Sequence, residues 1–123
     1  MTIMSLIIAL IQVESNNNDL AIGDKGQAYG CLQIHKTYVD DVNRILGRKE
    51  YIHEDAFCRD KSIEMFMIYT DHYATHKRLG REPTIEDIVR IHNGGPNGWK
   101  KPTTIRHLNK VKNQLYDNAT RPL

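Results

Sequence analysis

Residues 3–15, IMSLIIALIQVES, constrain the fold of this chain more than any other stretch. The segment is apolar on nearly every face, so it predicts a helix that is central rather than superficial. Three asparagines at 16–18 then end the helix, because asparagine side chains compete for local backbone hydrogen bonds. The helix closes on Glu14, and a carboxylate in that position is unusual for so apolar a segment.

The composition indicates one small globular domain. The chain has 123 residues, 40% of them hydrophobic and 26% charged, which suits a single folded domain. A net charge of +2 excludes a strongly cationic nucleic-acid-binding protein, and we expect no nucleic-acid partner. The apolar start is too short to span a membrane and lacks the basic residues and cleavage site of a signal peptide. We therefore expect neither a membrane span nor a signal peptide in this chain.

The remaining pattern predicts an α+β, mostly α domain over residues 1–116 and a polar tail over 117–123. Three glycines within residues 19–34 favour a small β-hairpin or sheet there. Thr84 and Asp87 approximate a capping box at the start of a helix. About five helices are expected in all, at residues 3–15, 36–46, 56–79, 85–92 and from 103 or 104 to 115.

Two acidic residues are candidates for catalysis. A buried carboxyl group resists ionisation, so Glu14 at the end of an apolar helix could act as a general acid. Glu14 could also be a solvated helix-end residue, although the helix dipole disfavours a negative charge there. Asp24 lies ten residues on, and a glycosidase needs such a pair of carboxylates. The spacing alone favours an ordinary turn around Asp24 instead.

The segment HNGGPNG, residues 92–98, is the third candidate feature. Its glycines would let a ligand approach the main chain closely, and Asn93 offers both a donor and an acceptor. A long irregular connection between two helices is the alternative.

The cysteines and histidines give weaker signals. Cys31 and Cys58 could form one disulfide or be two ordinary buried thiols, and their spacing fits no zinc pattern. His72 and His76 are four residues apart on an expected helix but have no evident third ligand, so surface histidines are favoured over a metal site. We expect no metal and no cofactor.

Three motifs in order resemble the lysozyme-like superfamily. They are Glu14-Ser15, GCLQI at 30–34 and RIHNGGPNG at 90–98. The last is nearly verbatim that of the invertebrate-type (destabilase) lysozymes, and the domains of soluble lytic transglycosylases are the next most similar. The resemblance extends from about residue 8 to about residue 112.

This resemblance implies a lysozyme-like fold and a peptidoglycan glycosidase. The implied substrate is peptidoglycan or a chitooligosaccharide, cleaved at the β-1,4 bond between N-acetylmuramic acid and N-acetylglucosamine. Glu14 would be the general acid and Asp24 the second carboxylate. The implied substrate-binding residues are Ser15, Tyr29, Gln33, His92, Asn93 and Gly94. The resemblance implies a protein, expected to be a monomer, that acts at the cell wall without a cofactor.

Two other functions stay open at this point. A lytic transglycosylase would use Glu14 alone and form 1,6-anhydro products, and a non-catalytic glycan-binding module could share the fold. The chain also departs from the family. It has two cysteines where invertebrate-type lysozymes are disulfide-rich, and His107-Leu108 replace an aromatic pair. Residues 26–29 replace the serines that some destabilases carry, which speaks against an isopeptidase activity.

Overall fold

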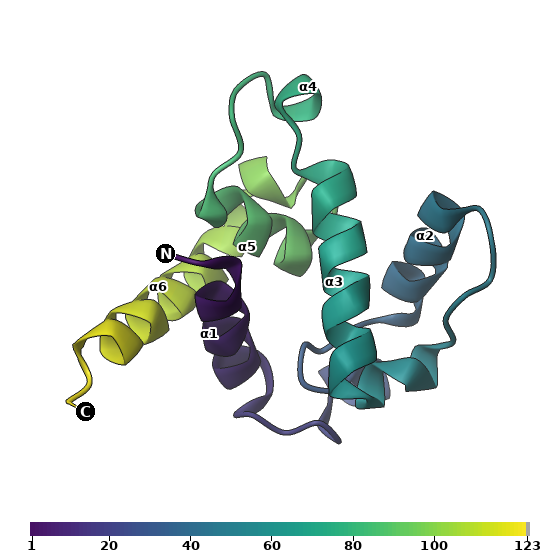
Figure 1. The fold of residues 1–123 in the computed structure, drawn as a ribbon, viewed down its shortest axis with the longest axis horizontal. Coiled ribbons are helices and arrows are strands. Elements are labelled where there is room, and N and C mark those ends of the chain that lie inside the picture. The colour runs from purple at the N-terminus through teal and green to yellow at the C-terminus, as the bar shows by residue number, and fades with distance from the viewer. Residues whose placement is uncertain (123) are drawn as a thin grey trace.

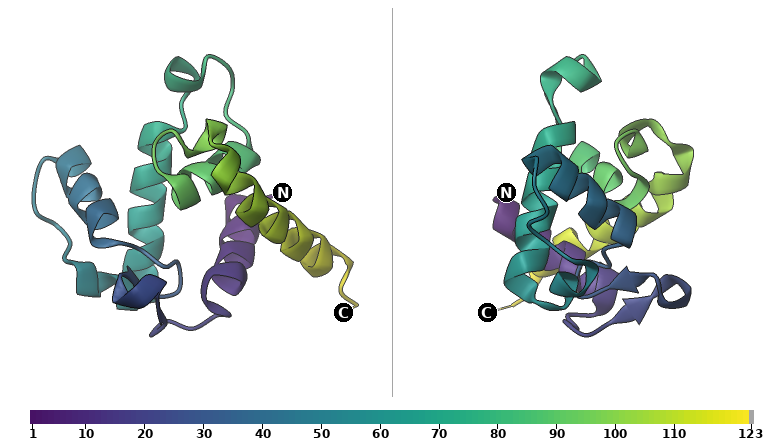
Figure 2. Two further views of the ribbon diagram at one scale, coloured as in Figure 1. Left: turned by 180° about the vertical axis from the view of Figure 1, so that it is seen from behind. Right: turned by 90° about the vertical axis from the view of Figure 1, so that its right-hand side faces the viewer.

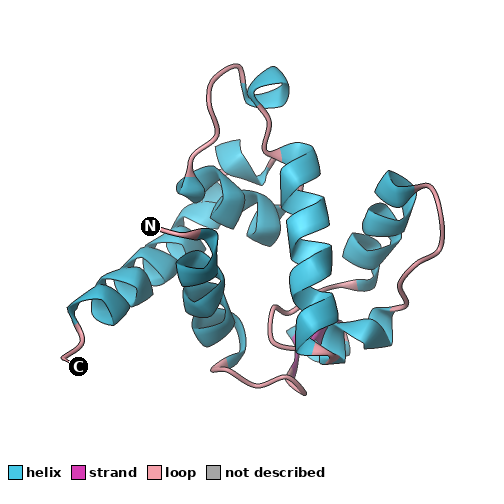
Figure 3. Cartoon of the chain, in the orientation of Figure 1, coloured by secondary structure: helices cyan, strands magenta, loops and turns pink. Residues whose placement is uncertain are grey.

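A computed structural model describes residues 1–122 of the chain. The expected mostly helical α+β class is confirmed, with six α-helices, short 3-10 turns and one two-stranded antiparallel sheet in this part of the chain (Figures 1 and 3). The strands are β1 (Ile22–Gly23) and β2 (Ala28–Tyr29). The helices are α1 (Ile3–Ser15), α2 (Lys36–Leu46), α3 (Arg59–Tyr73), α4 (His76–Leu79), α5 (Ile85–Gly94) and α6 (Ile105–Thr120).

Helix α1 has the predicted bounds. The Thr2 hydroxyl accepts a hydrogen bond from the Ser5 amide at its start, and Asn16 ends it in the left-handed conformation at φ 55°. The expectation of a fully central helix is wrong, because Met4 and Ile8 are 51% and 57% exposed. The helix packs mainly against α6, and the face that carries Met4 and Ile8 is exposed among the described residues.

The hairpin that follows α1 depends on two close backbone approaches. Ile22 pairs with Tyr29 and Gly23 with Ala28 across the sheet. A Cβ atom on Gly23 would lie 2.2 Å from the side-chain oxygen of Gln33. One on Gly30, at φ +80°, would lie 1.8 Å from the carbonyl oxygen of Ala56. Glycine is therefore required at position 30, where the obstacle is backbone and φ is positive, whereas a side chain at position 23 would have to displace the Gln33 side chain. Both are among the three glycines that marked this segment in the sequence.

The single helix expected over residues 56–79 is wrong. The chain forms a 3-10 turn at His53–Phe57, then α3, and then α4 as a separate short helix. Ala74 leaves helical geometry at ψ 76°, and the Thr75 hydroxyl caps α4 by accepting from the amide of Arg78. A threonine cap within the expected helix thus starts a new one, because its side chain replaces a missing backbone partner.

Two helix ends lie beyond the expected residues. Helix α5 continues two residues past His92 to Gly94, and α6 continues five residues past Leu115 to Thr120. The expected tail over 117–123 thus begins inside α6, and the division of the chain at residue 116 stays a prediction.

Helix α3 lies at the centre of the molecule, with α2 on one side and α1 and α6 on the other (Figures 1 and 2). The hairpin lies at the end of the molecule where α1 and the start of α3 meet (Figure 2). Both cysteines are free thiols, so the alternative of a disulfide between them is wrong. The alternative of two buried thiols holds for Cys31, whereas Cys58 is exposed. No helix within residues 1–122 has the length and apolar character needed to cross a membrane.

Candidate active site

A cleft of about 1010 Å³ opens between two walls of the molecule. One wall is the end of α1 with the first turns of α6, and the other is the hairpin with α2. The end of α5 and one side chain of α3 lie between them. The lining includes Glu14, Asp24, Gln33, His35, Tyr38, Asp40, Asp41, Arg44, Tyr69, His92, Asn93, His107 and Lys110. Both predicted acids therefore face the same cleft.

Glu14 lies on the first wall with its side chain only 11% exposed. Its Oε1 atom is 2.9 Å from Nε2 of His107 on α6, a side chain that is 16% exposed. The distance is that of an ion pair, but the angles are not those of a hydrogen bond, and His107 Nε2 has no hydrogen-bond partner among the described residues. The two atoms are therefore in close contact without a hydrogen bond between them.

Asp24 lies on the second wall in a different environment. Its backbone is left-handed at φ 47°, at the start of the 3-10 turn Asp24–Gly26 between the two strands. Its side chain is 60% exposed and its Oδ2 atom is 3.1 Å from Nε2 of His35, which is 39% exposed. Solvent therefore reaches this carboxylate from the hairpin side.

His92 forms the floor of the cleft and joins the two walls. Its Nε2 is 3.0 Å from the carbonyl oxygen of Leu32, and its Nδ1 is 3.0 Å from the hydroxyl of Tyr38. Burial lowers the pKa of His92, which keeps the ring neutral. A carbonyl only accepts, so Nε2 carries the proton and Nδ1 accepts from Tyr38. His92 is thus held on both sides and is a neutral, fixed part of the site.

The side of the cleft formed by α2 and α3 is aromatic. Tyr38 and Tyr69 stack with ring centroids 3.8 Å apart, and Tyr69 meets Tyr73 edge to face. Burial raises the pKa of both Tyr38 and Tyr69, so these phenols stay protonated at neutral pH. Tyr73 donates to Asp41 and accepts from Arg44, which also binds Asp41. These rings are almost wholly buried, so they form a rigid backing for this side of the cleft.

The predicted substrate-binding residues divide into two groups. Gln33, His92 and Asn93 line the cleft, whereas Ser15, Tyr29 and Gly94 do not. Gln33 is itself fixed, since its amide nitrogen donates to the carbonyl of Gly30 over 3.0 Å.

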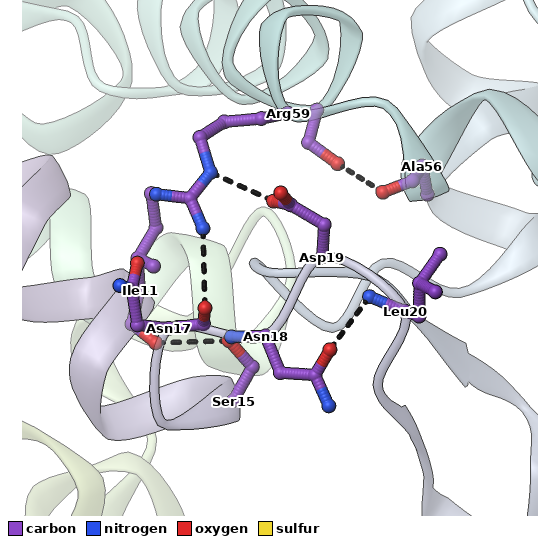
Figure 4. A network of polar contacts seen from close by, with 9 residues as sticks. Ile11, Ser15, Asn17, Asn18, Asp19, Leu20, Ala56 and Arg59 are labelled. Atoms are coloured by element: carbon purple, nitrogen blue, oxygen red, sulfur yellow. Dashed lines mark hydrogen bonds and ion pairs between the residues drawn. The ribbon is translucent and has the colours of Figure 1, made fainter.

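The three residues outside the cleft have structural contacts of their own. The Ser15 hydroxyl donates to the Ile11 carbonyl and accepts from the amide of Asn18, which fixes the turn after α1 (Figure 4). Tyr29 stacks on His53 with centroids 3.7 Å apart, beside a second pocket of about 330 Å³. Gly94 packs against Thr104, where a Cβ atom would lie 2.4 Å away.

The turn between the two acids is held by an ion pair. Arg59 at the start of α3 donates to Asp19 over 2.7 Å and to the carbonyl of Asn17 over 3.3 Å (Figure 4). This contact ties the chain between Glu14 and Asp24 to the central helix.

Sequence reasoning missed the two histidines that contact the acids. His35 directly follows the GCLQI motif, and His107 lies one turn after Thr104 and next to Leu108, on the inner side of α6. The sequence does contain one indication of this position. Residues 104, 107, 108 and 111 have the spacing of one helix face, which places His107 beside the buried residues of α6.

The described residues include no group of three His, Cys, Asp or Glu side chains arranged to hold a metal ion. His72 and His76, the pair noted in the sequence, are both exposed.

Comparisons with known proteins agree on one family, although no protein-family model matches the chain. The chain is 32% identical to a lysozyme of Ostrea edulis over 88 residues, which are 69% of this chain and 58% of that protein. It is 28% identical to a lysozyme of Magallana gigas over 120 residues, 92% of this chain and 81% of the relative. It thus spans little more than half of the Ostrea edulis protein.

The fold has a solved counterpart as well. A chain in the crystal structure of Aeromonas hydrophila PliI in complex with Meretrix lusoria lysozyme matches with a TM-score of 0.74 and 26% identity. The match covers 89% of this chain and 87% of that one. With its motifs in the family's order and bivalve lysozymes among its relatives, the chain belongs to the lysozyme-like family, alongside the invertebrate-type lysozymes.

Proposed function

We propose that this protein is a peptidoglycan glycosidase of the lysozyme type, a muramidase that cleaves the β-1,4 bond between N-acetylmuramic acid and N-acetylglucosamine. The observation that carries the proposal is the carboxyl group of Glu14, 11% exposed and facing a cleft that also contains Asp24. A shielded acid opposite a solvated one is the arrangement of a glycosidase, because one group must hold a proton while the other stays ionised. Relatives named lysozyme support the same reaction.

Glu14 serves as the general acid in this proposal. Its carboxyl proton passes to the glycosidic oxygen as the bond to the sugar carbon breaks, which leaves an oxocarbenium-like centre. If Asp24 is the nucleophile, it forms a glycosyl-enzyme ester, and Glu14 then takes a proton from the water that hydrolyses this ester and is thereby restored. If Asp24 is instead the base, it takes the proton of the attacking water, and proton exchange with solvent restores both carboxyl groups. The neutral His92 and Tyr38 keep the floor of the cleft free of a competing charge.

The sugar chain would lie along the cleft, across the lining residues Gln33, His92 and Asn93. Asn93 supplies the donor and acceptor that an N-acetyl group or a hydroxyl requires. The stacked Tyr38 and Tyr69 would support this side of the cleft from behind. Ser15, Tyr29 and Gly94, which lie outside the cleft, would support it indirectly.

A lytic transglycosylase is the second candidate, because its reaction uses Glu14 alone. The observation that favours it is the position of Asp24, whose side chain is 60% exposed and, among the described residues, forms an ion pair only with the accessible His35, so that little in the fold fixes its carboxylate for attack on the sugar. In the transglycosylase reaction the substrate's own N-acetyl group replaces the second carboxylate, and the muramic acid oxygen at C6 closes a 1,6-anhydro ring in place of water.

Mass spectrometry of the muropeptides released from purified peptidoglycan distinguishes the two reactions. We expect reducing-end products from the wild-type protein, no product from Glu14→Gln, and a strongly reduced yield from Asp24→Asn. Anhydro products whose yield survives Asp24→Asn would replace the hydrolase with the transglycosylase. Glycan binding without products from the wild-type protein would instead indicate a non-catalytic module.

The same proposal assigns a place of action. A protein that cleaves peptidoglycan acts at the cell wall, and we infer an extracellular, periplasmic or phage-delivered enzyme that acts as a monomer on the glycan.

A further inference from the structure

The contact between Glu14 and His107 joins two helices on one wall of the cleft. Glu14 is the last acidic residue of α1, and His107 belongs to the first turn of α6. Both side chains are mostly buried, and 2.9 Å separates Glu14 Oε1 from His107 Nε2. With no hydrogen-bond partner among the described residues, Nε2 of His107 has Glu14 as its ion-pair contact.

The other titratable groups of the cleft are uncharged, lie at its edge or belong to the opposite wall, several of them in ion pairs of their own. Tyr38 of α2 and His92 of α5 sense the charge of Glu14, and burial keeps both uncharged. Lys110 is one turn further along α6, at the edge of the cleft. Across the cleft lie further titratable groups, namely Asp24, His35, Asp40, Asp41, Arg44 and Tyr69. Of these, Asp24 is paired with His35 and Asp41 with Arg44.

We propose that His107 is a positioning residue for Glu14, which orients the carboxyl group from α6 and sets the pH at which that carboxyl loses its proton. This inference rests on the proposed glycosidase function and extends it to a residue outside the family's motifs.

The physical basis is that one proton can be held by the pair in two ways. With the proton on His107, the imidazolium stabilises an ionised Glu14, because an opposite charge within about 4–6 Å favours the charged form of a carboxyl group. With the proton on Glu14, both groups are neutral, and the carboxyl group lies against the ring of His107. Only the second arrangement can protonate the glycosidic oxygen. His107 therefore limits the active form to lower pH, and its removal extends that form to higher pH.

The pH dependence of kcat/KM tests this directly with His107→Gln. The amide keeps a polar group against Glu14 but cannot carry a positive charge. We expect the alkaline limb of the profile to move up by about 1 pH unit, while the acidic plateau changes by no more than about 3-fold. His76→Gln, the same substitution at an exposed histidine of α4, is the matched control and should leave the profile unchanged. A variant with lower activity at every pH and an unmoved limb would overturn the proposal, since a structural role alone predicts that result.

A second measurement keeps the proposal testable if either the variant or the proposed activity fails. The imidazole resonances of the wild-type protein and of Glu14→Gln are followed by NMR across the pH range, and His107 is assigned by its absence from His107→Gln. We expect the midpoint of His107 to fall in Glu14→Gln, because the imidazolium loses its negative partner. An unchanged midpoint would overturn the coupling. A wild-type protein without glycosidase activity but with a shifted midpoint would refute the proposed function while leaving the coupled pair intact.

Discussion

The two walls of the cleft carry the same pair of groups in opposite environments. On the wall formed by α1 and α6, Glu14 and His107 are 2.9 Å apart, with side chains 11% and 16% exposed. On the wall formed by the hairpin and α2, Asp24 and His35 are 3.1 Å apart, with side chains 60% and 39% exposed. The distances are nearly equal, so the difference between the two pairs lies in the solvent around them.

Solvent decides how strongly each histidine acts on its acid. At one distance, the interaction of two charges grows several-fold as the effective dielectric falls from that of water to that of a protein interior. Water and salt therefore screen the interaction of Asp24 with His35 more than that of Glu14 with His107. A histidine that acts on its acid is expected on the first wall alone.

The largest difference in kcat/KM should come from shortening the Glu14 side chain, or lengthening the Asp24 side chain, by one methylene group. Glu14→Asp withdraws the carboxyl from a fixed, shielded position, and a misplacement of about 1 Å can cost about 100-fold in rate. We expect kcat/KM on peptidoglycan to fall by about that factor, whereas Asp24→Glu, at an exposed turn, should lose less than about 10-fold. Equal losses in the two variants would show that burial does not distinguish the walls. Circular dichroism of both variants serves as the folding control.

The sequence predicts some parts of the two walls better than others. The bounds of α1 and the position of Glu14 followed from the asparagines that end the helix, since a stop signal acts locally. The hairpin could be located by Gly23 and Gly30, but the reason for each glycine, a close approach to Gln33 or to Ala56, is a contact across the fold. Local patterns therefore placed the acids but not their environments.

The partners of the acids were beyond sequence reasoning for the same reason. His107 is 93 residues from Glu14 in the chain, and nothing in the sequence around either residue indicates that α6 packs on α1. The break of the helix at Ala74 was missed because Thr75 acts as a cap only once α3 has ended. Long-range packing, which the three-dimensional structure supplies, decides these points.

An intermediate effect is expected at the floor that joins the walls. His92→Gln disturbs the hydrogen bonds to the Leu32 carbonyl and the Tyr38 hydroxyl, so we expect the free energy of unfolding at about pH 7.5 to fall by about 1–3 kcal/mol. Urea unfolding monitored by fluorescence measures this loss.

The pH dependence of that loss identifies its source. Burial lowers the pKa of His92 below the ordinary value of about 6.5 for an unfolded histidine, so the unfolded chain binds a proton more readily. The stability from the neutral ring is thus complete above about pH 6.5 and decreases as the pH falls below it. The difference between wild type and His92→Gln should therefore narrow at about pH 5.5. An equal difference at both pH values would indicate that His92 is not held neutral.

The smallest effect should come from the exposed pair. His35→Gln removes the partner of Asp24, but exposed ion pairs contribute less than about 1 kcal/mol, and salt weakens them further. We expect kcat/KM to change by no more than about 2-fold at an ionic strength of about 0.1 M, and the alkaline limb of its pH profile to stay in place. His107→Gln, measured alongside it, should move that limb, because its partner is shielded from the same ions. A limb that moves equally in both variants would mean that Asp24 and Glu14 are equally coupled to their histidines, and that the contrast in exposure has no consequence for the chemistry.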